Sequence, residues 1–225
     1  MKRDYIIAVD GPSGAGKSTV SRKLAEKLGY LYLDTGAMYR AAALKAMKLG
    51  LDLDSQDAVK VIVGNLDIKL VRNDRPRVLL DGEDVSEDIR GPEMGMAASR
   101  ISAHAVIREK MWELQRKLGE KGGVVAEGRD VGTMVFPDAD YKFFVTAGAE
   151  ERAGRRHREL VAKGYKVNYA QVLEEVKKRD EQDQNRKLAP LKPAADAVLI
   201  DTTGINAEQA VDRILSCIKV GNPGE

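Results

Sequence analysis

Short apolar runs alternate with longer amphipathic segments along most of the chain. The apolar runs lie at 5–9, 31–33, 124–126, 142–146 and 197–200. The amphipathic segments lie at 17–28, 37–49, 105–118, 150–163, 169 to about 186 and 207–219. Buried strands separated by amphipathic helices are typical of a parallel sheet. The pattern therefore predicts an α/β fold with a five-stranded parallel sheet, in which Asn206 caps the last helix.

The pattern changes between about residues 55 and 95. A short helical segment is followed by two alternating runs, at 67–71 and 77–80, which flank the turn-like sequence RNDRP and precede DGEDV. Alternation with a period of two is typical of half-buried strands, and Asn, Asp, Pro and Gly are turn residues. This segment predicts an α+β subdomain inserted into a single domain that spans 1–225.

Composition limits the class of protein without identifying a partner. The 225 residues carry a net charge of +2 and are 43% hydrophobic and 32% charged, which describes one globular folding unit. A balanced charge gives no general attraction to nucleic acid or membranes. No apolar run approaches the roughly 20 residues that span a bilayer. We expect a cytoplasmic, disulfide-free monomer, with its one cysteine, Cys217, packed in the core.

A phosphate-binding loop is predicted between the first strand and the first helix. The sequence GPSGAGKS, from Gly11 to Ser18, matches the pattern GxxxxGK[ST] in the strand and helix context that this motif requires. Glycines allow backbone N–H groups to converge on phosphate oxygens, Lys17 adds a positive charge, and the Ser18 hydroxyl suits Mg²⁺. The residues expected to bind nucleotide are Gly11, Pro12, Ser13, Gly14, Ala15, Gly16, Lys17, Ser18 and Thr19.

Other nucleotide-binding motifs fit less well. The same glycines have a GxxGxG spacing, and Asp34 follows about 20 residues later, as in a dinucleotide-binding fold. That kind of site has no use for a Lys-Ser pair at the start of the helix. GTPases usually carry an NKxD segment, which is absent from this sequence. These features favour a kinase that phosphorylates a small molecule.

Arginines follow several predicted strands. Arg40 lies in LDTGAMYR, Arg129 lies in EGRDVGT, and EERAGRRHREL contributes Arg152, Arg155, Arg156 and Arg158. Ligands of open α/β sheets collect at the carboxyl ends of strands, and arginine binds phosphate in a bidentate manner. The EERAGRRHREL segment is either an exposed basic helix or a mobile lid. Asp130 is a base reader, a metal-linked carboxylate or a loop cap.

The segment RDEQDQNR, at 179–186, contains no apolar residue. A solvated helix face explains most charge runs of this kind. Arg179, Asp183 and Arg186 are spaced i, i+4 and i+7, so on a helix they share one stripe that can grip an anionic ligand with hydroxyl groups. Asp180 and Glu181 lie off this stripe, and for them we expect only contact with solvent.

With these motifs in order, the chain resembles the bacterial cytidylate kinases of the long type over nearly its whole length. The segments that carry the resemblance are VDGPSGAGKST, LDTGAMYR, DGEDVSEDIR, EGRDVGTMVFPDADYKFFV, EERAGRR and RDEQDQNRKLAPLKPA. The resemblance implies a P-loop kinase core, a monophosphate-binding insert at about 55–95 and a helical lid at about 149–168. It also implies transfer of the γ-phosphoryl group of ATP, with Mg²⁺, to CMP or dCMP.

The resemblance also implies roles for individual residues. Cytosine would be read by Ser99, Arg108 and Asp130, and the sugar would be held by Arg179 and Asp183. The acceptor phosphate would be held by Arg40, Arg129 and Arg186, with Thr35 nearby. Lys17, Arg129 and Arg186 would act in catalysis. Two alternatives remain open, namely a P-loop kinase for another small acceptor and a nucleotide-binding regulator without catalytic activity.

Overall fold

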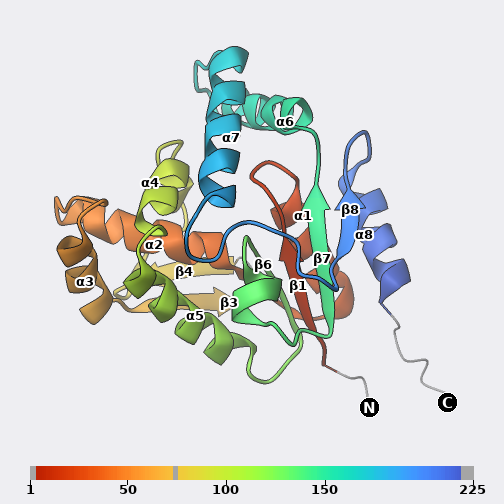
Figure 1. The fold of residues 1–225 in the computed structure, drawn as a ribbon, viewed down its shortest axis with the longest axis horizontal. Coiled ribbons are helices and arrows are strands. Elements are labelled where there is room, and N and C mark those ends of the chain that lie inside the picture. The colour runs from red at the N-terminus through yellow and green to blue at the C-terminus, as the bar shows by residue number, and fades with distance from the viewer. Residues whose placement is uncertain (1–3, 73–75, 219–225) are drawn as a thin grey trace. The chain divides into compact units, whose positions relative to one another are not determined.

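The computed structural model describes residues 4–72 and 76–218 (Figure 1). Part of the predicted RNDRP turn, at 73–75, therefore lies outside the described residues. The chain divides into two compact units. The first unit combines 1–32 with 119–225, and the second unit comprises 33–118. Within the described ranges, no helix combines the length and apolar character needed to cross a bilayer.

A five-stranded sheet has four of its strands wholly within the first unit, while its edge strand β2 includes the first two residues of the second unit. Its strands lie in the order β2-β6-β1-β7-β8. Their bounds are Leu31–Asp34 for β2, Val124–Gly128 for β6, Ile6–Asp10 for β1, Tyr141–Thr146 for β7 and Val198–Asp201 for β8. Strand β1 pairs in parallel with β6 and β7, and β7 pairs in parallel with β8. All five strands coincide with predicted apolar runs, so the predicted α/β fold is confirmed.

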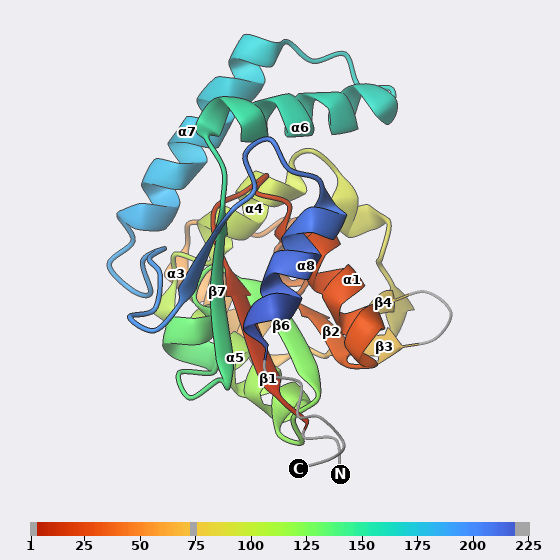
Figure 2. The same cartoon turned by 90° about the vertical axis from the view of Figure 1, so that its right-hand side faces the viewer.

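Two helices pack together against one face of this sheet (Figure 2). They are α1, Lys17–Leu28, and α8, Ala207–Cys217. Asn206 caps α8 as predicted, because its side chain accepts a hydrogen bond from the Gln209 N–H at 3.0 Å. The expectation for Cys217 is wrong. The buried stripe of α8 contains Ala210, Val211 and Ile214, and Cys217 lies off it with its side chain exposed.

Helices α6 and α7 form a hairpin in the first unit (Figure 1). Helix α6, Ala149–Ala162, begins shortly after β7, and α7 comprises Tyr169–Gln184. The hairpin has a small core of its own, which contains Ala153, Leu160, Val172 and Val176. Because α7 ends at Gln184, Arg186 lies beyond the helix, and the predicted single helical stripe through Arg186 is wrong.

The second unit contains four α-helices, a short 3₁₀ helix, Asp88–Arg90, and a small antiparallel sheet in the part of the chain that the structure describes. The helices are α2, Thr35–Lys48; α3, Gln56–Gly64; α4, Met94–Ile101; and α5, Ala105–Gly119. Strands β3, Ile68–Arg72, β4, Pro76–Leu80, and β5, Glu83–Asp84, form the sheet in that order. The two alternating runs are thus strands, as predicted. Helix α4 was not expected from the sequence.

Candidate active site

The loop at 11–16 joins β1 to α1 and requires glycine at several positions. Gly11, Gly14 and Gly16 have φ values of 144°, 76° and 88°, which side-chain-bearing residues rarely adopt. A Cβ atom on Gly11 would also lie 1.9 Å from the Val145 carbonyl oxygen. Gly16 is the N-cap of α1 and provides no side-chain cap, so the N–H groups of the first turn remain available to an anion.

Lys17 is the first residue of α1 and is buried beside this loop. Its side chain donates a hydrogen bond to the Pro12 carbonyl oxygen at 2.7 Å. The pKa of Lys17 is lowered from 10.5 to about 7, mainly by burial and then by the positive charges of Arg129 and Arg179, against the opposing effect of Glu127. A buried site with this excess of positive charge favours a bound anion.

Ser18 and Thr19 follow in the first turn of α1 and are exposed. Across 4–72 and 76–218, no three His, Cys, Asp or Glu side chains cluster in a way that would hold a metal ion. An accessible hydroxyl such as that of Ser18 fits an ion such as Mg²⁺, which retains water and takes its other ligands from bound phosphates. The donor set is therefore suited to a metal ion that arrives with a nucleotide.

Two arginines of α6 contact carbonyl groups of the phosphate loop. Arg152 donates a hydrogen bond to the Ser13 oxygen at 3.0 Å, and Arg155 lies 3.5 Å from the Ala15 oxygen. Arg155 also donates to the hydroxyl of Thr202, at 3.0 Å, and to the Thr202 carbonyl oxygen, at 2.6 Å. These two arginines tie the α6–α7 hairpin to the loop and to the end of β8.

The other two arginines of α6 face outward. Arg156 pairs with Glu159 at 3.1 Å on the surface, and Arg158 donates to the carbonyl oxygen of Gly154 at 3.2 Å. The EERAGRRHREL segment is therefore neither uniformly exposed nor uniformly directed inward. Arg152 and Arg155 face the phosphate loop, while Arg156 and Arg158 belong to the solvated side of the helix.

Asp180 forms a buried ion pair, which corrects the expectation that it would only contact solvent. Its carboxylate accepts two hydrogen bonds from Arg152, at 3.0 and 2.5 Å. The side chains of Arg152 and Asp180 are only 6% and 16% exposed. On α7, Asp180 continues the i, i+4 stripe of Val172 and Val176 that packs against α6, and this stripe brings it to Arg152. Glu181 is exposed, as expected.

Asp183 lies at the centre of an arginine cluster. Its carboxylate accepts a hydrogen bond from Arg129 Nε at 2.9 Å, and Arg186 Nη1 lies 3.7 Å from its other oxygen. Burial by itself raises the pKa of Asp183, but the charges of Arg129, Arg186 and Arg179 outweigh it and hold the pKa below its ordinary value. The structure thus brings together four of the predicted site residues, and Asp183 orients at least two of the arginines.

Asp130 is buried directly before a turn of π-helix, η2, Val131–Val135. Its side chain does not cap this turn. The carboxylate of Asp10 does so instead, since it accepts hydrogen bonds from the N–H groups of Val131, at 2.8 Å, and Gly132, at 2.7 Å. Burial raises the pKa of Asp10 to about 6 despite these two bonds. The loop-cap interpretation of Asp130 is therefore wrong, and the capping residue, Asp10, was missed.

The predicted site residues of the second unit lie on α2, α4 and α5. Thr35 is the first residue of α2 and is buried. Asp34 caps this helix by accepting a hydrogen bond from the Ala37 N–H at 2.8 Å, and the same carboxylate accepts one from Arg40 at 3.0 Å. Arg40 is thereby held over the first turn of α2 with its side chain 27% exposed.

Ser99 and Arg108 belong to one hydrogen-bonded cluster. The Ser102 hydroxyl donates to the Ser99 carbonyl oxygen at 2.9 Å, and Arg108 Nε donates to the Ser102 carbonyl oxygen at 2.7 Å. Ser102 is the C-cap of α4, where a helix presents carbonyl groups that attract a cation. The two predicted base readers of the second unit are thus connected through Ser102.

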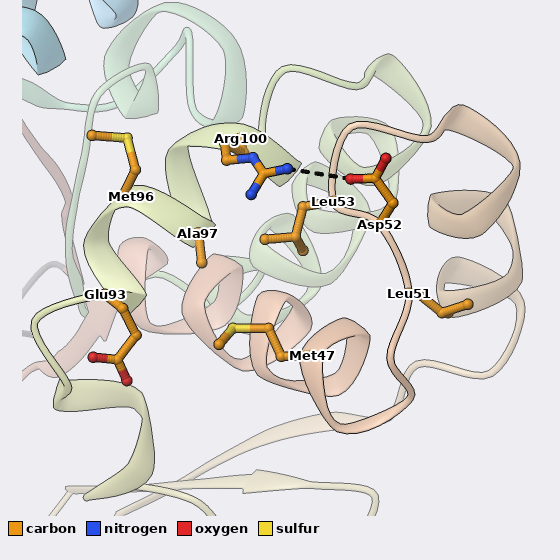
Figure 3. A pocket seen from close by; sticks show the side chains of 8 residues that line it. All are labelled: Met47, Leu51, Asp52, Leu53, Glu93, Met96, Ala97 and Arg100. Carbon is orange, nitrogen blue, oxygen red and sulfur yellow. Dashed lines mark hydrogen bonds and ion pairs between the residues drawn. The ribbon is translucent and has the colours of Figure 1, made fainter.

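The second unit also contains a cavity of about 370 Å³ between α2, the loop that follows it and α4 (Figure 3). Its lining residues are Met47, Leu51, Asp52, Leu53, Glu93, Met96, Ala97 and Arg100. Arg100 is held at its mouth by Asp52 and Asp54. None of the predicted site residues lines this cavity, so it is separate from the candidate active site.

The chain is similar in fold to solved structures. A shikimate kinase from Bacteroides thetaiotaomicron superposes with a TM-score of 0.51 at 13% identity, over 95% of this chain and 97% of that one. An uncharacterized protein from Eubacterium ventriosum superposes with a TM-score of 0.52 at 15% identity, over 95% and 98% of the two chains. At such low identity these similarities concern the fold alone.

Comparison with the sequences of known proteins gives much higher identities than comparison with these structures. The chain is 52% identical over 219 residues to the cytidylate kinase of Syntrophotalea carbinolica, covering 97% of this chain and 93% of that protein. It is 50% identical over 213 residues to the cytidylate kinase of Carboxydothermus hydrogenoformans, covering 94% and 96%. A family model described as cytidylate kinase matches residues 7–220. Since this match includes both the phosphate loop and the arginine cluster, the chain belongs to the cytidylate kinase family.

Proposed function

We propose that the protein transfers the γ-phosphoryl group of ATP to CMP or dCMP, giving ADP and CDP or dCDP. The observation that carries this proposal is the arrangement of charge in the first unit. Lys17 is buried at the phosphate loop, and its pKa is lowered by burial and by the charges of Arg129 and Arg179. Arg129 and Arg186 in turn share the carboxylate of Asp183. Arg129, which we expect to hold the acceptor, is therefore close enough to Lys17, which we expect to hold the donor, for its charge to lower the pKa of Lys17.

Phosphoryl transfer requires mainly positioning and neutralisation of charge. The phosphate loop would hold the donor with its backbone N–H groups, and Lys17 would stabilise negative charge on the transferred group. Arg129 and Arg186 would hold the acceptor phosphate, because their guanidinium groups are permanently charged and already oriented by Asp183. Groups fixed in this way need little rearrangement as charge develops in the transition state.

Mg²⁺ is the cofactor that the phosphate loop would use. The Ser18 hydroxyl would ligate it, with the remaining positions filled by phosphate oxygens and water. When bound, the ion supplies positive charge that neutralises the triphosphate. Thr19 and the other loop residues would contact the nucleotide itself.

Each unit contains residues that we expect to recognise the acceptor. In the second unit, Ser99 and Arg108 would read the cytosine, while Arg40 would hold phosphate with the assistance of Thr35, which lies on the same helix, α2. In the first unit, Asp130 would read the base, and Arg179 and Asp183 would hold the sugar. Hydrogen bonds to the exocyclic amine would give the preference for cytosine, because a buried site rejects an analogue that leaves its polar groups unpaired.

A coupled assay of ADP release over several acceptors tests this proposal. The purified protein is supplied with ATP, Mg²⁺ and one of CMP, dCMP, UMP, AMP or shikimate. We expect rapid turnover with CMP and dCMP, weaker turnover with UMP, and none with AMP or shikimate. Turnover of AMP or shikimate without CMP would assign the protein to another acceptor. ATP binding with no release of ADP under any condition would indicate a regulator.

A further inference from the structure

The aromatic ring of Tyr39 lies against the guanidinium group of Arg108. The central carbon of that group, Cζ, is 5.6 Å from the ring centroid. Tyr39, on α2, is 7% exposed, and Arg108, on α5, is 1% exposed. Arg108 Nε also donates to the Ser102 carbonyl oxygen at 2.7 Å. Three segments of the second unit therefore meet at one buried cation.

The two contacts restrict Arg108 in different ways. The hydrogen bond from Nε to the Ser102 carbonyl oxygen holds one edge of the guanidinium plane. An aromatic face attracts a cation and favours particular orientations of a planar guanidinium group. Burial strengthens this attraction, because little water competes for the charge. Tyr39 therefore favours a particular orientation of the Arg108 guanidinium plane.

We propose that Tyr39 is a positioning residue that orients Arg108 for recognition of the cytosine base. This inference rests on the proposed function, in which Arg108 reads that base. A guanidinium group can only donate hydrogen bonds. Cytosine offers acceptors at its carbonyl oxygen and the adjacent ring nitrogen, whereas uracil carries an N–H at that nitrogen. The orientation of the donors then decides how strongly the site discriminates between the two bases.

A packing role for Tyr39 makes a different prediction. The same face of α2 buries Met38, Ala42 and Ala43, so loss of the ring would also leave a cavity. A cavity would affect stability and activity whether or not Arg108 is present. A positioning role requires Arg108, so its effect must disappear when Arg108 is removed.

The test is a double-mutant cycle with Tyr39→Leu and Arg108→Ala, in which kcat and KM are measured for CMP, UMP and ATP. We expect Tyr39→Leu to raise KM for CMP about tenfold and to reduce the CMP-to-UMP preference similarly, with KM for ATP unchanged. In the Arg108→Ala background the same substitution should change KM for CMP less than about twofold.

Tyr39→Phe, which keeps the ring, should restore the CMP preference. Tyr39→Met serves as a second non-aromatic variant if Tyr39→Leu does not fold.

The possible outcomes separate the inference from the proposed function. If the unmodified protein does not phosphorylate CMP, the proposed function fails and the inference fails with it. If it phosphorylates CMP but the effects of Tyr39→Leu and Arg108→Ala on KM for CMP are additive, only the inference is overturned. Tyr39 is then a packing residue. An unchanged CMP-to-UMP ratio in both non-aromatic variants would overturn it as well.

Discussion

Lys17 and Asp183 are buried, ionisable residues, and their surroundings lower the pKa of both side chains. Burial and neighbouring arginines lower the pKa of Lys17 to about 7, whereas the arginines around Asp183 keep that carboxyl ionised. The excess of positive charge at Lys17 is unfavourable until an anion binds. At the scale of single residues, the charges around Lys17 therefore favour an anionic ligand.

Binding of ATP is predicted to take up protons. At about pH 8 most Lys17 side chains are neutral in the free protein, because their pKa is about 7. Bound phosphates raise this pKa by opposite charge, so Lys17 gains a proton as ATP binds. Calorimetric titrations in buffers with different ionisation enthalpies measure this uptake. It should be smaller at pH 6, where Lys17 is already charged, and absent in Lys17→Met. Equal uptake in Lys17→Met would assign the proton to another group.

Removal of the Arg186 guanidinium group is predicted to impair use of CMP. Arg186→Ala should lower kcat/KM for CMP by about a hundredfold, because one fixed donor to the phosphate is lost. KM for ATP should change little. The matched control is Lys187→Ala, which removes a charge from the neighbouring, exposed residue. If both variants behave like the unmodified protein, Arg186 belongs to a solvated face and has no part in the reaction.

At the scale of elements, the α6–α7 hairpin is attached to the sheet by polar contacts of Arg152 and Arg155. Besides the ion pair with Asp180, Arg152 donates to the Ala147 carbonyl oxygen at 2.9 Å and to Ser13. The hairpin has only a small apolar core of its own. Its position over the phosphate loop therefore depends strongly on these two arginines.

The ion pair between Arg152 and Asp180 is predicted to stabilise the fold much more than a surface pair. Loss of one partner leaves a buried charge uncompensated, so Arg152→Ala should lower the free energy of unfolding by roughly 3 kcal/mol. Arg156→Ala, which breaks the exposed pair with Glu159, should cost less than about 1 kcal/mol. Urea unfolding at pH 7 measures both values. Similar values for the two variants would mean that the Arg152 pair is not effectively buried.

Several elements could be predicted from the sequence because their signals are local. The predicted α1 segment agrees with the structure at both ends, since Gly16 precedes it and Gly29 follows it in the left-handed conformation. Helix α4 was missed because it comprises only 8 residues, within a segment rich in Met, Gly and Ala. The inward orientation of the Asp180 side chain was missed because it depends on the packing of α7 against α6.

Contacts between distant segments were beyond sequence reasoning. Asp10 and Val131 are 121 positions apart, and only the pairing of β1 with β6 brings the carboxylate to η2. The DGPSG sequence alone gave no reason to connect Asp10 with the segment that contains Arg129 and Asp130. Likewise, the contact between Tyr39 and Arg108 requires the packing of the second unit.

At the scale of the whole molecule, each of the two units carries part of the proposed chemistry. The first unit contains the phosphate loop, the α6–α7 hairpin and the arginine cluster around Asp183. The second unit contains Arg40 and the cluster that connects Ser99 with Arg108. The residues proposed to contact the donor thus belong to the first unit, whereas residues proposed to contact the acceptor belong to both units.

The most direct test of the central claim follows the transferred phosphoryl group itself. ATP with a radiolabelled γ-phosphate is incubated with the protein, Mg²⁺ and CMP, and the products are separated by chromatography. We predict that the label appears in CDP in amounts equal to the ADP formed, and that Lys17→Ala abolishes this transfer. Label that accumulates as inorganic phosphate, with none in CDP, would contradict the assignment of CMP as the acceptor.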